Sequence, residues 1–175
     1  MNKKVLYLAL VYSALVIAFK LFILLGGHSL SHFGYFYSNL SAVLFIYPFY
    51  IILIKWLRDK DYNGVMSGRE AFRHCLALFA VSVVLISIYN YVEFKRYGPG
   101  LAEQYYRGND FLQFLKSQKN VKPGDYQRII EEQIKNGSES AFKATTGKLF
   151  SYLVLGISGA FVISAAMKRN AIKTN

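Results

Sequence analysis

The chain has 175 residues, of which 54% are hydrophobic, 17% aromatic and 18% charged, and its formal net charge is +11. Soluble domains carry about 25% charged residues. This chain therefore has too few charges to cover a water-facing surface, and its many aromatic residues exclude a disordered polypeptide.

Four apolar stretches are long enough to cross a bilayer as helices, which takes about 20 residues each. They cover residues 5–25, 33–54, 72–92 and 149–167. Buried helices of a soluble protein would show a polar stripe with a period of about 3.6 residues, and these stretches do not. The first stretch is too long for the core of a signal peptide and precedes no A-x-A cleavage pattern. The sequence predicts an all-α integral membrane protein, one four-span domain over residues 1–175.

The orientation follows from the connections between the spans. The amino-terminal tail, the connection between spans two and three and the carboxy-terminal tail are basic, whereas the first connection contains no Lys or Arg. By the positive-inside rule, both termini lie in the cytoplasm. Lys95, Arg96 and Lys148, which flank the long third connection, conflict with this orientation. Because no segment concentrates the positive charge, we expect no nucleic-acid partner.

Residues 95–148 are predicted to form a helical extramembrane insertion. Gly98-Pro99-Gly100 is expected to end the third membrane helix, since Pro lacks a backbone donor. From Pro123 to Asn136, apolar Tyr126, Ile130 and Ile134 recur every four residues, which indicates an amphipathic helix. Such helices can pack together as a cap or lie flat on the membrane.

The start of the third membrane helix carries a local signal. Ser67-Gly68-Arg69-Glu70 has the spacing of a capping box, in which Ser67 and Glu70 bind the free amide groups at a helix start.

The order of these features resembles a known family. The residues that carry the resemblance are the GREAF stretch at 68–72, the Tyr-rich segment SIYNYVEFKRYGPGLAEQYY at 87–106 and the short fourth span after a helical linker. They are similar to a family of small bacterial four-helix membrane proteins that is catalogued as a domain of unknown function. The resemblance implies four spans and a bacterial inner membrane, and it implies no catalytic residue.

Lys20 is the one charge inside the first span. A lysine about five residues from the span's end can snorkel to the headgroups, and the alternative is a role in binding an ion or an anionic headgroup. Gly156, Ala160 and Ser164 form a stripe of small residues along span four. This stripe favours close helix packing, either within the chain, where Ala14 and Ala18 offer a matching surface, or in a homodimer.

Other chemically interesting residues have simpler explanations. His28 and His32 have the spacing of metal ligands but no acidic residue or cysteine beside them, so we expect no metal site. Cys75 in an apolar helix is expected to be an inert hydrophobe. Glu70, Arg73 and His74 come nearest to a catalytic group, but Glu70 is explained as a cap and Arg73 as a topological signal. We therefore expect no enzyme, no catalytic residue and no cofactor.

Two functions remain from different classes. The first is a non-enzymatic accessory or scaffold subunit of the inner membrane that acts through helix packing and its helical cap. Its partners would be the lipid bilayer and either a second copy or another membrane protein. The alternative is a subunit of a small oligomeric transporter or channel. Coupled transport usually needs an acidic residue or histidine inside the membrane, and the four spans contain no carboxylate.

Overall fold

The computed structural model describes residues 2–29, 40–118, 121–137 and 141–168, which are almost entirely helical. The elements in chain order are α1 (Lys3–Leu25), α3 (Ile46–Asp61), α4 (Gly68–Tyr106), α5 (Asn109–Ser117), the 3-10 helix η1 (Pro123–Asp125), α6 (Tyr126–Gly137) and α7 (Ala141–Met167). These described residues contain no strand.

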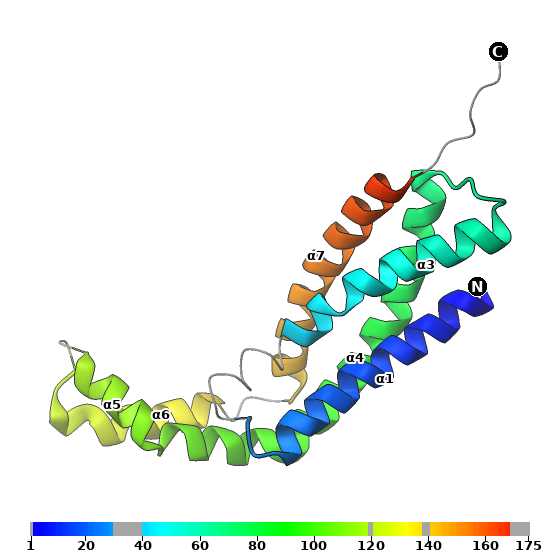
Figure 1. Ribbon diagram of the computed structural model, residues 1–175. Helices are drawn as coiled ribbons and strands as arrows, with labels where there is room; N and C mark the ends of the chain where they lie inside the picture. Colours follow the sequence, from blue (N-terminus) through cyan, green and yellow to red (C-terminus); the bar gives the residue numbers. More distant parts are fainter. Residues whose placement is uncertain (1, 30–39, 119–120, 138–140, 169–175) are drawn as a thin grey trace.

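Within the described ranges, four helical segments have the length and hydropathy of membrane spans: Lys3–Leu25, Leu40–Asp61, Gly68–Tyr106 and Ala141–Met167. In Figure 1, α1, α3, α7 and the first part of α4 run alongside one another. The rest of α4 leads away from this bundle and forms a separate group with α5 and α6 (Figure 1). The prediction of an all-α membrane protein with four spans is confirmed, and the chain is a multi-pass membrane protein.

The bundle is apolar outside as well as inside. Tyr12, Tyr50 and Leu78 are fully buried at its centre. On the outer faces, Phe22, Phe161 and other large apolar side chains are exposed over more than 60% of their surface. A soluble monomer rarely exposes apolar patches of more than a few hundred Å², so this surface is suited to lipid.

The second span differs from its predicted limits. Its aromatic beginning at 33–39 lies outside the described residues. The helix continues to Asp61, beyond the predicted end at Ile54, and is interrupted at Phe45. This interruption lies just before Pro48, which occupies the first turn of α3. A proline clashes with the carbonyl group four residues earlier, which explains why a new helix starts there.

The third span does not stop where the sequence predicts. α4 passes through Pro99 and ends at Tyr106, so the predicted end at Gly98-Pro99-Gly100 is wrong. A proline inside a helix costs about 3 kcal/mol or more. The helix persists because its last turns pack against α6 and α5, and these tertiary contacts outweigh the local preference to break.

We call residues 93–118 and 121–137 the arm. Phe111 and Leu115 of α5 and Ile130 of α6 form a small apolar core that is separate from the core of the bundle. Tyr106, at the end of α4, packs against this core. The helices of the arm thus pack on one another, while α7 already begins at Ala141, within the predicted insertion.

Candidate functional site

Lys20 points into the protein at the point where the arm leaves the bundle. Its exposed fraction is 0%, and its Nζ lies 3.8 Å from Oε2 of Glu93 on α4. A snorkelling lysine would extend its ammonium group toward water, so the snorkelling interpretation is wrong. The charge is satisfied inside the chain instead.

Glu93 reaches this position through the register of α4. The buried face of α4 passes through Ser82, Ile86 and Asn90 at helical spacing, and Glu93 is the next residue along it. Glu93 lies one residue beyond the predicted third span, and for this reason the four predicted spans contain no carboxylate. The continuing spacing of the buried face is the signal that could have identified it.

A third helix, α7, completes the site. Lys148 lies close enough to interact electrostatically with both Lys20 and Glu93. One turn further along α7, Tyr152 is almost fully buried and lies near Asn90 and Glu93. We call Lys20, Glu93, Lys148, Asn90 and Tyr152 the polar cluster. It joins three helices that are distant in sequence.

The polar cluster retains unused hydrogen-bonding capacity. Within the described part of the chain, the hydroxyl of Tyr152 and both side-chain polar atoms of Asn90 are buried without a hydrogen-bond partner. The neighbouring hydroxyls of Tyr89 and Thr145 share this property. An unsatisfied buried polar group costs about 1–3 kcal/mol, so these groups are suited to bind water or a small polar ligand.

The charges of the polar cluster do not balance. Two lysines lie near one carboxylate, which gives a formal net charge of +1. Buried charges persist only when paired and hydrogen-bonded. Glu93 is therefore the essential counter-charge, and the arrangement can hold the base of the arm against the bundle, bind an anion or exchange a proton.

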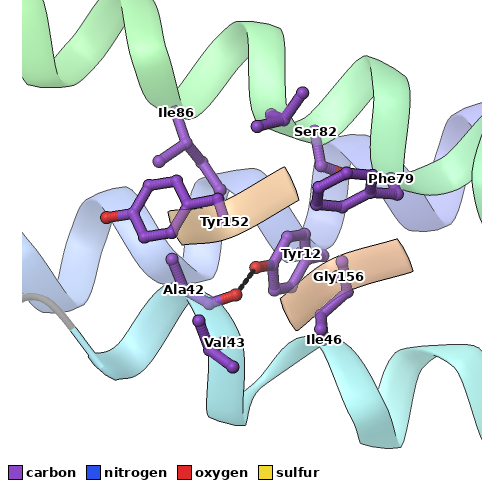
Figure 2. Close-up of a pocket in the computed structure, with 10 residues that line it drawn as sticks. Tyr12, Ala42, Val43, Ile46, Phe79, Ser82, Ile86, Tyr152 and Gly156 are labelled. Atoms are coloured by element: carbon purple, nitrogen blue, oxygen red, sulfur yellow. Dashed lines mark hydrogen bonds between the residues drawn. The ribbon is translucent and has the colours of Figure 1, made fainter. Parts of the chain in front are cut away.

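The apolar interior beside the polar cluster is tightly filled. Tyr12 donates a hydrogen bond to the carbonyl oxygen of Ala42, across a cavity of only about 10 Å³ (Figure 2). The hydroxyl of Tyr152 points away from the Tyr12 ring (Figure 2). A cavity of this size holds about one water molecule.

The small residues of α7 pack within the chain. Gly156, Ala160 and Ser164 are buried, whereas Ala14 and Ala18 of α1 are exposed. A Cβ atom at Gly156 would lie 2.3 Å from Cε2 of Phe79 on α4. The partner of the stripe is therefore α4 and not the predicted surface of α1. A homodimer through this stripe would have to displace Phe79.

Tyrosine hydroxyl groups reinforce this packing. Tyr50 on α3 donates a hydrogen bond of 3.0 Å to the carbonyl oxygen of Gly156. A Cβ atom at Gly159 would lie 2.1 Å from Cε1 of Tyr47, which is also on α3. The glycines of α7 thus allow both α3 and α4 to approach its backbone.

Two of the three residues considered for catalysis make structural contacts. Ser67 and Glu70 form the capping box at the start of α4, with the Glu70 carboxylate accepting from the Ser67 backbone N–H at 3.0 Å. His74 pairs with the hydroxyl of Tyr62 at 2.9 Å. Arg73 is exposed. These contacts explain the side chains at positions 70 and 74.

For metal ions, the sequence predicts no binding site. The described residues contain no group of three or more His, Cys, Asp or Glu side chains that could hold a metal ion. Cys75 is buried. His32 lies outside the described residues, so the predicted pair of His28 and His32 is not placed.

Comparisons with known proteins identify the family. The family described as "Protein of unknown function (DUF4199)" matches residues 6–169, nearly the whole chain. No curated protein and no solved structure matches. The four apolar helices agree with the family of small membrane proteins that the sequence resembles. The chain therefore belongs to the DUF4199 family, whose function is unknown.

Proposed function

We propose that this protein is a non-enzymatic accessory or scaffold subunit of a bacterial inner-membrane complex, and that its arm binds the partner protein. The single observation that carries this proposal is a cluster of exposed aromatic rings on the arm. Tyr105 and Phe114 are 45% and 54% exposed. Both rings pack against Phe111, with centroids 5.8 and 6.0 Å away.

Exposed aromatic rings held in place suit protein recognition. Tyr and Phe are enriched in interfaces, where they bury a large area. The rings of Tyr105 and Phe114 are fixed by Phe111, which is itself buried in the small core of the arm. Binding a partner would therefore order few side chains, and this lowers the entropic cost of association.

The arm is also positioned by the bundle. α4 runs without interruption from the membrane span into the arm. At the base of the arm, Glu93 is tied to Lys20 of α1 and lies near Lys148 of α7. A continuous helix held from two sides supports a fixed direction for the arm, as a scaffold requires.

Site-specific photo-crosslinking in the native membrane tests this proposal. Phe114 would be replaced by p-benzoylphenylalanine, and Val84, 57% exposed on the membrane part of α4, would be the matched control position. We expect a discrete protein adduct from position 114 that is weakened by Tyr105→Ala, and none from position 84. A protease-resistant, membrane-inserted chain that gives no protein adduct at position 114 would overturn the scaffold role.

A second function, a subunit of an oligomeric transporter or channel, is favoured by the polar cluster. Lys20 and Glu93 place an ion pair against the membrane spans, and ionisable residues at such depth often mark ion or proton pathways. Flux of protons or anions through reconstituted vesicles would distinguish the two functions. The scaffold role predicts no flux above protein-free vesicles. Flux that a folded, membrane-inserted Glu93→Gln variant loses and that the arm variant Glu103→Gln preserves would support the transporter.

The orientation belongs to the same proposal. We infer that both termini lie in the cytoplasm, and the basic residues at one end of the bundle support this orientation. At that end, Lys4 at the start of α1 pairs with Asp61 at the end of α3. The arm leaves the opposite end (Figure 1), and in this orientation it meets its partner outside the cytoplasm.

A further inference from the structure

We propose that the groove between the start of α4 and the end of α7 binds the headgroup of an anionic phospholipid. The groove has a volume of about 270 Å³. Arg69 and Lys168 supply its cationic groups, and Phe72 and Phe161 supply its apolar wall. This site is separate from the polar cluster and does not depend on the scaffold role.

The groove exists because α4 begins with a glycine beside α7. A Cβ atom at Gly68 would lie 3.7 Å from the carbonyl oxygen of Ser164 and 3.8 Å from Cβ of Lys168. These are ordinary contact distances, so a methyl group would fit but a larger side chain would enter the groove. Arg69 on α4 and Lys168, one residue beyond the end of α7, line the same groove.

The walls of the groove match the two chemical parts of a phospholipid. The rings of Phe72 and Phe161 meet edge to face, with centroids 6.1 Å apart. Phe161 is 65% exposed, and Val162 beside it is 63% exposed, so the apolar wall continues onto the outer surface of α7. A phosphate would lie at the two cations, while its acyl chain follows this apolar surface.

The charge at this end of the bundle favours an anion. The described basic residues here are Lys3, Lys4, Lys55, Arg58, Lys60, Arg69, Arg73 and Lys168, and the acidic ones are Asp59, Asp61 and Glu70. All three carboxylates have partners: Asp59 pairs with Arg58, Asp61 with Lys4, and Glu70 with Ser67. Arg69 and Lys168 appear in none of these pairs, and basic pockets between membrane helices are known to hold anionic headgroups. Phe161 and Ala165, which line the groove, are exposed on α7, a candidate membrane span, and this favours a membrane lipid over free phosphate as the source.

The test measures lipid binding at the groove itself. A tryptophan is introduced as Phe161→Trp in a Trp56→Phe background, which leaves one reporter because the chain contains one tryptophan. The protein is reconstituted in vesicles of phosphatidylcholine with brominated phosphatidylglycerol or brominated phosphatidylcholine, and quenching gives the relative affinity of the two lipids. We expect a preference for phosphatidylglycerol, with each cation contributing up to roughly fivefold.

Two sets of variants make the result specific. Arg69→Gln with Lys168→Gln should reduce the preference to about one. Lys55→Gln with Lys60→Gln removes the same charge from exposed positions at the same end outside the groove and should preserve it. No preference in the parent protein, or an equal loss in both double variants, would overturn the proposal. A second reporter, Val84→Trp, should show no such preference, and an equal preference there would indicate a general surface effect and also overturn it.

Discussion

The ammonium group of Lys20 on α1 lies 3.8 Å from the carboxylate of Glu93 on α4, at the level where α4 leaves the bundle. Lys148 on α7 interacts with the same carboxylate. One acidic side chain therefore interacts with cations from two other helices. This asymmetry, one carboxylate for two lysines, determines how the chain should respond to substitution.

Glu93→Gln is expected to destabilise the protein more than Lys20→Met. Loss of Glu93 leaves two neighbouring cations without a counter-charge, and breaking a buried ion pair on one side costs about 3–5 kcal/mol. Loss of Lys20 still leaves Lys148 near Glu93. Lys20→Met should therefore reduce the free energy of unfolding by about 1–2 kcal/mol less than Glu93→Gln does. The free energy of unfolding in detergent, followed by helical content, measures both. The exposed pair of Glu103 with Arg107 provides the control, because Glu103→Gln should change little. Equal losses for the two substitutions would contradict the shared role of Glu93.

Gly156→Ala is expected to destabilise the bundle by about 1–3 kcal/mol, because the added methyl group overlaps the ring of Phe79. Phe79→Leu should recover part of this loss in the double variant. At Gly147, an added Cβ atom meets nothing within 4 Å. Gly147→Ala should therefore stabilise α7, by up to about 1 kcal/mol. Thermal unfolding measures the stability of each variant. A Gly156→Ala variant as stable as the parent protein would show that α7 and α4 are not in close contact at Gly156.

Phe111→Ala should unfold the arm while the bundle remains intact. Truncation of a buried Phe costs about 3–5 kcal/mol, and the core of the arm contains few other buried side chains. Limited proteolysis should cut the variant within the arm and leave protected membrane fragments. Phe114→Ala, which truncates an exposed ring, should remain resistant. If both variants are equally resistant, the arm does not depend on this core.

Reporter fusions after Ser31, Tyr62, Asn120 and Asn175 should read outside, inside, outside and inside. The physical reason is the concentration of basic residues in the tails and in the second connection. Paired reporters that are active on opposite sides of the membrane control for expression. A cytoplasmic signal from the fusion after Asn120 would show that the arm lies in the cytoplasm and would contradict the predicted orientation.

Features that depend on nearby residues could be predicted from the sequence. The four spans follow from uninterrupted apolar stretches, because the bilayer requires every backbone group to bond within its own helix. The Ser67–Glu70 capping box follows from two side chains three residues apart, which meet whenever a helix begins there. The amphipathic helix at Pro123–Asn136 follows from its own period and corresponds to η1 and α6.

Only the tertiary structure decided which helix faces meet. The sequence could not reveal that Lys20 pairs with Glu93, that Phe79 fills the space beside Gly156, or that Arg69 and Lys168 share one groove. It also predicted a break at Pro99, where packing against α6 and α5 keeps α4 helical. The physical reason is the same throughout: hydropathy and local hydrogen bonding determine where a helix forms in the membrane, whereas the rotation of each helix toward its neighbours depends on contacts between residues far apart in the chain.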